Sequence, residues 1–196
     1  MSDFRSALID TGKEAIAIVP PGGSVAVGVD GMDVFVDKRL EFDFSRMKAS
    51  EAPSGPTPAN FLPIPVTIRD GTMIIADVTV NGVHAKALID SGARRTIGNA
   101  ALQAAVGFKN HDPRFTAADP VGGATGDKAP ASKAELETIK LGKATFEKPL
   151  VTFADLPVFE PLGLAHTPGL ILGLDQLMHL EALAIDYPRS ELQVKP

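Results

Sequence analysis

Asp90 is the residue whose setting in this sequence most clearly suggests chemistry. It follows the apolar run Ala87–Ile89 and precedes Ser91, Gly92 and Ala93. A lone carboxylate at the end of an apolar strand is costly unless it has a role or a partner. Gly92 allows a backbone geometry that a side chain would forbid, and it lets another chain approach closely. The Ser91 hydroxyl can hydrogen-bond to a neighbouring backbone, so this turn has the residues needed to hold two such loops face to face.

The stretch Leu88–Ala93 resembles the active-site loop of aspartic proteases, in which two apolar residues precede Asp, Thr or Ser, Gly, and Ala or Thr. The family has a later apolar pair followed by Gly, which packs beneath this loop, and Ile171, Leu172 and Gly173 fit that pattern. The glycine-rich segment 121–127 lies between the two motifs, where the family has its flap hairpin. The sequence is therefore similar to retropepsin-like aspartic proteases, in particular to bacterial two-lobed members.

This resemblance implies a fold, a function and a mechanism. The expected fold class is all-β, a retropepsin-like (pepsin-type) closed β-barrel lobe with one or two short helices. Asp90 would supply one of two carboxylates that activate water to hydrolyse a peptide or protein substrate, without a cofactor. The second carboxylate would come from a second copy in a homodimer or from a first lobe. The flap is expected at Gly123, Ala124, Thr125 and Gly126.

Short strands dominate the pattern of the C-terminal segment. Ile64–Ile68, Met73–Val80 and Val83–Ile89 alternate or are rich in β-branched residues. Asp70-Gly71 and Asn81-Gly82 are hairpin turn signals between them. Many short strands and little helix predict an all-β, barrel-like domain. Further elements are expected as helices at Asn99–Val106 and Asp175–Leu180 and strands at Ala134–Leu141, Thr145–Phe153, Gly169–Gly173, Leu183–Tyr187 and Glu191–Val194.

An internal repeat and a proline-rich stretch predict the domain organisation. Phe42–Arg46 resembles Ile185–Arg189, and Val27–Asp30 resembles Leu172–Asp175 at a nearly equal offset. Residues after Arg46 are small, polar or proline, which is a linker composition. We therefore expect a C-terminal remnant of a first retropepsin-like lobe, a linker and a complete retropepsin-like lobe, at residues 1–46, 47–59 and 60–196.

Asp10 is a second candidate aspartate, because Leu8–Gly12 also spells the active-site motif. The spacing argues against it. Only 15 residues separate this motif from the repeated element at Val27, whereas the complete copy has 80. No flap or supporting strands fit in that gap, and the repeat aligns Asp10 with Asp155, near the end of a lobe.

Arg94 and Arg95 depart from the family pattern, which usually has Ser or Thr after the Ala. Positive charge beside Asp90 would lower the pKa of that carboxyl group. Alternatively, both guanidinium groups point to solvent. The departure keeps open a rival function, a catalytically inactive peptide-binding or dimerisation module on the aspartic protease fold. A third alternative is a processing fragment that awaits its other half.

Composition argues against several other classes of function. The net charge of −5 argues against a nucleic-acid surface, and no apolar run reaches the length of a membrane span. The chain has no Cys, and its four His residues lack ligand spacing, so no metal site is predicted. The compartment stays open from composition, and only the resemblance to bacterial proteins favours an exported or periplasmic location.

Overall fold

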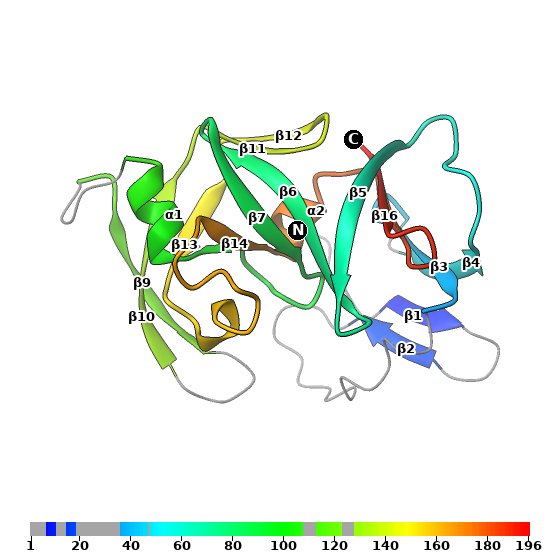
Figure 1. The fold of residues 1–196 in the computed structure, drawn as a ribbon, viewed down its shortest axis with the longest axis horizontal. Coiled ribbons are helices and arrows are strands. Elements are labelled where there is room, and N and C mark those ends of the chain that lie inside the picture. Colours follow the sequence, from blue (N-terminus) through cyan, green and yellow to red (C-terminus); the bar gives the residue numbers. More distant parts are fainter. Residues whose placement is uncertain (1–6, 11–14, 19–35, 47, 108–112, 123–127) are drawn as a thin grey trace. The chain divides into compact units, whose positions relative to one another are not determined.

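The computed structural model describes residues 7–10, 15–18, 36–46, 48–107, 113–122 and 128–196, with the backbone alone for the first two ranges (Figure 1). Contacts within the chain define two compact units. Unit 1 comprises Met1–Ile74 and Leu177–Pro196, and unit 2 comprises Ile75–Gln176. This division differs from the three parts expected from the sequence, and the assignment of residues 1–46 to a remnant lobe stays a prediction.

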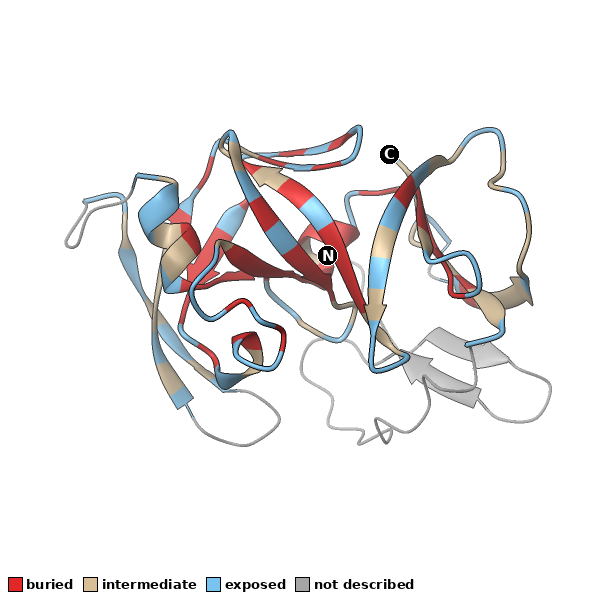
Figure 2. Cartoon of the chain, in the orientation of Figure 1, coloured by how far each residue is buried: buried red, intermediate tan, exposed pale blue. Residues whose placement is uncertain are grey.

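Unit 2 is built on a sheet with the strand order β6-β7-β14-β8-β13-β10-β9, to which β11 and β12 add beside β6. The strand β14 runs parallel to β7 and antiparallel to β8, and all four of its residues are buried (Figure 2). The strands are β6 (Met73–Val80), β7 (Val83–Ile89), β8 (Ile97–Gly98), β9 (Thr116–Gly122), β10 (Lys128–Glu135), β11 (Thr138–Leu141), β12 (Ala144–Glu147), β13 (Leu150–Phe153) and β14 (Gly169–Leu172).

The two hairpin turns predicted from the sequence are confirmed. Asp70 and Gly71 have φ values of 48° and 75°, and Asn81 and Gly82 have values of 47° and 84°. Positive φ at both central residues is the geometry of the turn that best matches strand twist in a two-residue hairpin. The Asn81 side chain adds support, because its Oδ1 accepts hydrogen bonds from the amides of Glu137 at 2.9 Å and Thr138 at 3.0 Å.

The helices are short, as expected. The helix α1 (Ala100–Ala105) begins after Asn99, whose Oδ1 accepts from the Leu102 amide at 2.8 Å, and Gly107 follows its end with φ of 82°. In the described part of the chain, the other helical elements are the 3₁₀ turn η3 (Pro157–Phe159) and α2 (Leu174–Leu177). No helix of the described residues is long and apolar enough to cross a membrane.

The all-β class is confirmed, but the expectation of a closed barrel is wrong. Among the described residues, β9 pairs only with β10 and β12 pairs only with β11, so the sheet keeps two open edges. The physical reason lies in β9, which has no buried residue along its length. A strand that is solvated on both faces has no apolar area to draw it back onto the sheet.

Unit 1 contains an antiparallel sheet with the order β4-β3-β15-β16-β5. Burial alternates along β3, where Leu40 and Phe42 are buried, whereas β15 and β16 are buried at consecutive residues, so the centre of this sheet is covered on both faces. A separate two-stranded sheet pairs β1 with β2. The strands are β1 (Ala7–Asp10), β2 (Ala15–Ile18), β3 (Lys38–Asp43), β4 (Lys48–Pro53), β5 (Leu62–Arg69), β15 (Ala182–Asp186) and β16 (Glu191–Lys195).

The expected linker, residues 47–59, contains the strand β4. Every residue from Lys48 to Pro53 stands opposite a residue of β3. Composition indicated a linker because small polar residues and prolines bury little apolar area. Backbone pairing does not need such area, and Ala49 is nevertheless buried, with 2% of its surface exposed.

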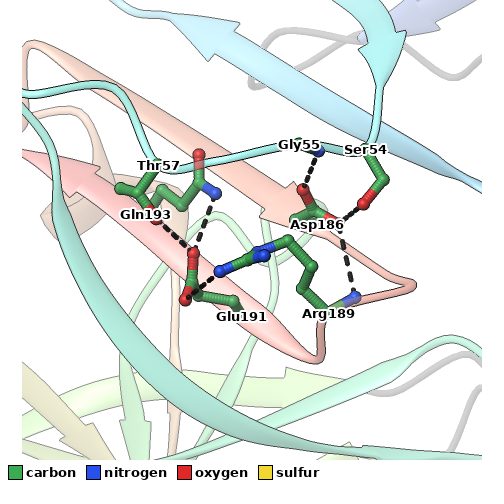
Figure 3. Close-up of polar contacts among 7 residues, drawn as sticks. All are labelled: Ser54, Gly55, Thr57, Asp186, Arg189, Glu191 and Gln193. Carbon is green, nitrogen blue, oxygen red and sulfur yellow. Dashed lines mark hydrogen bonds and ion pairs between the residues drawn. The ribbon is translucent and has the colours of Figure 1, made fainter.

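The segment after β4 is held against the β15–β16 hairpin through two carboxylates (Figure 3). Asp186 is fully buried, its Oδ1 accepts from the Ser54 hydroxyl at 2.7 Å, and its Oδ2 accepts from the Gly55 amide at 3.1 Å. Glu191 Oε1 accepts from the Thr57 hydroxyl at 2.5 Å. These contacts fix the second half of the expected linker on the sheet of unit 1.

Candidate active site

Asp90 lies at the end of β7, where the chain leaves the sheet of unit 2. Because β7 pairs in parallel with β14, Ile89 stands opposite Leu172, and the Asp90 amide donates to the Leu172 carbonyl at 3.1 Å. Ile89 and the two residues before it are buried, whereas Asp90 itself is half-buried. The apolar strand therefore carries one carboxylate to the edge of the core.

Backbone amides of the turn fix one oxygen of the Asp90 carboxylate. Its Oδ1 accepts from the Gly92 amide at 2.8 Å and from the Ala93 amide at 3.2 Å. A Cβ on Gly92 would lie 3.1 Å from the same oxygen, so glycine keeps this space free for the carboxylate. Neither Asp90 Oδ2 nor the Ser91 hydroxyl has a hydrogen-bond partner within the described ranges. The turn orients the carboxylate and leaves one of its oxygens available.

The Asp90 turn packs closely against the end of β14. A Cβ on Gly173 would lie 2.6 Å from both the carbonyl carbon and the oxygen of Arg95, and 2.9 Å from the Ala93 oxygen. Real Cβ atoms do not approach so closely, which makes glycine necessary here. The amide of Leu174 also donates to the Ala93 carbonyl at 2.8 Å. The structure thus brings the two glycine-containing motifs of the sequence into contact.

Ile171 and Leu172 support the same turn from the core. They stand opposite Leu88 and Ile89 across the parallel β14–β7 pair, and both are buried, at 5% and 0% exposure. Burying branched apolar side chains of this size stabilises a fold by about 1.5–3 kcal/mol each. The strands that position Asp90 are therefore held by the apolar residues on either side of it.

Thr96 and Asp175 form a second connection between the two motifs, and the sequence analysis did not identify it. The fully buried Thr96 hydroxyl donates to Asp175 Oδ1 at 2.8 Å and accepts from the Gly173 amide at 3.1 Å. The Thr96 amide donates to Asp175 Oδ2 at 3.1 Å. Hydrogen bonds to a carboxylate are stronger than those between neutral groups, so Asp175 holds Thr96 firmly in place. In the sequence, the only indication of this contact is that Thr96 lies close to the Asp90 motif and Asp175 lies close to Gly173.

Asn99 is a further buried polar residue that ties separate parts of unit 2 together. Besides capping α1, its amide group donates to the carbonyls of Leu164 at 2.6 Å and Thr167 at 2.8 Å. Its Oδ1 also accepts from the Gly169 amide at 3.2 Å. The loop that leads into β14 is therefore anchored to the start of α1 by one fully used side chain.

The expected flap residues, Gly123, Ala124, Thr125 and Gly126, lie outside the described residues. The strands on either side of them are β9 and β10, which pair antiparallel up to Gly122 opposite Lys128. A long antiparallel pair with a glycine-rich connection is the arrangement predicted for a flap, and that assignment stays a prediction.

The remaining candidate residues are placed as follows. Arg94 and Arg95 are both exposed and have no partner within the described ranges, which agrees with the solvent-facing alternative. Asp10 ends β1 in unit 1, and its side chain lies outside the description. Within the described ranges, no group of three or more His, Cys, Asp or Glu residues is placed so that it could hold a metal ion.

Comparison with known proteins assigns the chain to a class. A family model described as aspartyl protease matches residues 76–176, which is more than half of the chain. The chain belongs to the aspartyl protease family and is therefore an aspartic-type peptidase. The matched range contains Asp90, its turn, Gly173 and Asp175. This confirms the family that the two motifs indicated.

Two solved structures illustrate the similarity. One is a crystal structure of a retropepsin-like aspartic protease from Rickettsia conorii, at 21% identity and a TM-score of 0.48, covering 68% of this chain and 89% of that chain. The other is EIAV protease complexed with the inhibitor HBY-793, at 21% identity and a TM-score of 0.43, covering 58% of this chain and 93% of that chain. No curated protein matches the chain.

Proposed function

We propose that the protein is an aspartic endopeptidase in which Asp90 supplies one of two catalytic carboxylates. The observation that carries this proposal is the Asp90 turn itself. Two backbone amides hold Oδ1, while Oδ2 has no hydrogen-bond partner in the described part of the chain. A carboxylate that is oriented at the edge of a core, with one oxygen unused, is suited to act on a water molecule.

The mechanism requires a second carboxylate close to the first. Two carboxylates a few ångströms apart cannot both ionise cheaply, so their protons leave in two separate steps that belong to the pair. The ionised member takes a proton from water as the water attacks the scissile carbonyl. The protonated member donates a hydrogen bond to that carbonyl and polarises it.

The second carboxylate is proposed to come from another lobe, supplied by a second copy in a homodimer or by a first lobe of which residues 1–46 are the C-terminal remnant. The unused Ser91 hydroxyl supports this arrangement, because a hydroxyl at this point can hydrogen-bond to the turn of the other lobe. The substrate is proposed to be an extended peptide, with residues 123–126 as the flap that covers it.

A cleavage assay on size-separated species tests the proposal. The chain is resolved by size-exclusion chromatography, and each fraction is incubated with a peptide library whose products are identified by mass spectrometry. We expect cleavage only in fractions that contain paired lobes, because one lobe has one carboxylate. Full-rate cleavage by a monomer would contradict the two-lobe requirement. Binding of peptides without cleavage in every fraction would favour the inactive binding module instead.

A further inference from the structure

Arg94 and Arg95 are adjacent cations beside the Asp90 turn, and neither has a partner within the described ranges. The structure describes seven arginines, and the other five each have an interaction partner: Arg39, Arg46, Arg69, Arg114 and Arg189. The chain has 24 acidic residues against 19 Lys and Arg residues, so carboxylates are not scarce. Two neighbouring guanidinium groups without a counter-charge are therefore an exception among the described residues.

The two carboxylates that adjoin this segment are engaged by other groups. Both oxygens of Asp175 accept from Thr96, and Oδ1 also accepts from the Gln176 amide at 2.9 Å. Asp90 Oδ1 accepts from two amides of its own turn. The chain therefore uses these carboxylates to hold backbone and hydroxyl groups, and it leaves both guanidinium groups free to bind a carboxylate from elsewhere.

The backbone beneath the two arginines is held in place. The Ala93 carbonyl accepts from the Leu174 amide at 2.8 Å, and a Cβ on Gly173 would lie 2.6 Å from the Arg95 carbonyl group. Both arginine side chains are nevertheless exposed. A fixed backbone that carries exposed side chains loses little further freedom when a ligand binds to them.

Covalent geometry places both arginines within reach of a peptide that binds at Asp90. The Ala93 amide nitrogen lies 3.2 Å from Asp90 Oδ1. Standard backbone dimensions then put the Cα of Arg94 within about 8.5 Å of that oxygen, and the Cα of Arg95 within about 12 Å. An extended peptide advances about 3.3–3.6 Å per residue. The long arginine side chains can therefore contact residues up to about three positions from a scissile bond at Asp90.

We propose that Arg94 and Arg95 determine specificity by selecting peptides with an Asp or Glu side chain within about three residues of the scissile bond. The planar guanidinium group binds a carboxylate through two parallel hydrogen bonds. An ion pair exposed to water contributes little, but it becomes stronger where a bound peptide excludes water. The inference rests on the proposed function, because it names the substrate class of the same site.

Matched peptides measure this preference on the unmodified chain. A randomised peptide library is digested, and mass spectrometry aligns the products on the scissile bond. Peptides are then made in pairs that differ only by Glu or Gln at one position near that bond. We expect kcat/KM to be roughly tenfold higher or more with Glu at one position at least, and the ratio to fall at high ionic strength, which screens exposed charges. Equal kcat/KM for Glu and Gln at every position would overturn the proposal.

Substitution of the arginines tests whether they carry the preference. Arg94→Ser and Arg95→Ser should each lower the Glu-to-Gln ratio of kcat/KM, and the double variant should bring it close to one. Arg94→Glu combined with Arg95→Glu should favour Lys over Gln at the same peptide positions. Since neither side chain has a partner in the described part of the chain, these variants should unfold at the wild-type denaturant midpoint. A wild-type ratio in the double Ser variant would overturn the proposal.

Lys143→Ser is the charge-matched control. Lys143 is an exposed cation in the turn between β11 and β12, so its loss changes the net charge by the same amount as Arg94→Ser does. The control should keep the wild-type Glu-to-Gln ratio. If Lys143→Ser lowered the ratio as much as Arg94→Ser, the net charge of the chain would set the preference, and the assignment to the two arginines would be wrong.

Asp90→Asn separates this inference from the proposed function, because peptide binding can be measured without hydrolysis. The variant is incubated with the undigested library, and mass spectrometry identifies the retained peptides. We expect Asp and Glu to be enriched over Asn and Gln, and the enrichment to disappear when Arg94 and Arg95 are also replaced by Ser. If hydrolysis does not depend on Asp90 while this enrichment is found, only the proposed function fails. If hydrolysis depends on Asp90 while acidic peptides are not enriched, only the specificity inference fails.

Discussion

At the scale of single residues, local motifs could be identified from the sequence and distant contacts could not. Asp90, Gly92 and Ala93 are adjacent, and the hydrogen bonds that orient the carboxylate run within that turn. The pairing of Thr96 with Asp175 joins residues far apart along the chain. Nothing in the type of either residue indicates the other, because only the β7–β14 ladder brings them together.

Tyr187 gives a prediction for alkaline pH. Its hydroxyl is buried without a hydrogen-bond partner in the described residues, and burial raises the pKa of Tyr187 to about 12. Because the folded protein holds the Tyr187 proton more tightly than the unfolded chain does, the free energy of unfolding is unaffected by this group below the unfolded pKa of 10.0. It falls as pH rises from there through the folded pKa of about 12. Tyr187 is the only tyrosine of a chain without tryptophan, so tyrosinate absorbance reports it alone. We expect a native midpoint well above 10.

The control for Tyr187 is the same titration in denaturant, where the midpoint should return to the ordinary value of 10.0. A native midpoint equal to the denatured one would show that the hydroxyl is solvated. Tyr187→Phe should keep or raise stability, by up to about 1 kcal/mol, because it removes an unsatisfied buried polar atom.

At the scale of elements, turn chemistry was the most reliable guide. Asp70-Gly71 and Asn81-Gly82 form the predicted hairpins because their residue types tolerate positive φ. The strand β4 was missed, since its alanines, serine and proline carry no apolar alternation, and its place in the sheet comes from pairing with β3. A strand whose conformation depends mainly on pairing with a neighbouring strand cannot be predicted from its own residue pattern.

Gly173 gives a prediction for the contact between β14 and the Asp90 turn. Gly173→Ala would place a Cβ 2.6 Å from the Arg95 backbone, so one of the two elements must shift. We expect a loss of about 1–3 kcal/mol in the free energy of unfolding, as for overpacking in a core, together with reduced peptidase activity. Denaturant unfolding and peptide cleavage measure the two effects.

Gly55→Ala is the matched control, because a Cβ at Gly55 meets nothing within 4 Å and its φ is not positive. It should change the free energy of unfolding by less than about 0.5 kcal/mol. If both variants were equally stable and equally active, the close packing of β14 beneath the Asp90 turn would not matter for either property.

At the scale of the whole chain, the family and the all-β class could be predicted because the two motifs identify them. The open edges of unit 2 could not, since closure depends on whether β9 finds apolar contacts. The internal repeat pointed to a real structural symmetry, that of the β3–β4 and β15–β16 hairpins. The repeat also aligned Asp10 with Asp155, and that part of it stays a prediction. In the structure, the strand that ends at Asp10, β1, pairs with β2.

The acid stability of the chain should depend on Glu191, which holds the segment after β4 through Thr57. Burial by itself raises the pKa of Glu191, but hydrogen bonds from Thr57, Gln193 and Arg189 together hold it below its ordinary 4.5. A lowered folded-state pKa means stability that is present above the unfolded value and lost as pH falls through the folded one. Glu191→Gln should therefore flatten the decline of stability with acidification.

Denaturant midpoints measured between neutral pH and pH values below 4.5 check this prediction for Glu191. Glu147→Gln, at an exposed position on β12, is the control and should keep the wild-type pH dependence. An unchanged pH dependence in Glu191→Gln would show that its hydrogen bonds do not contribute to acid stability.

Peptide hydrolysis by Asp90→Asn tests the central claim most directly. The Asn side-chain oxygen can still accept the amides of Gly92 and Ala93, so the variant should fold and unfold as the wild type does. Loss of the general base should lower kcat by about 10²–10⁴-fold. Asp70→Asn, in an exposed turn, should retain full activity. Wild-type turnover by correctly folded Asp90→Asn would contradict the account.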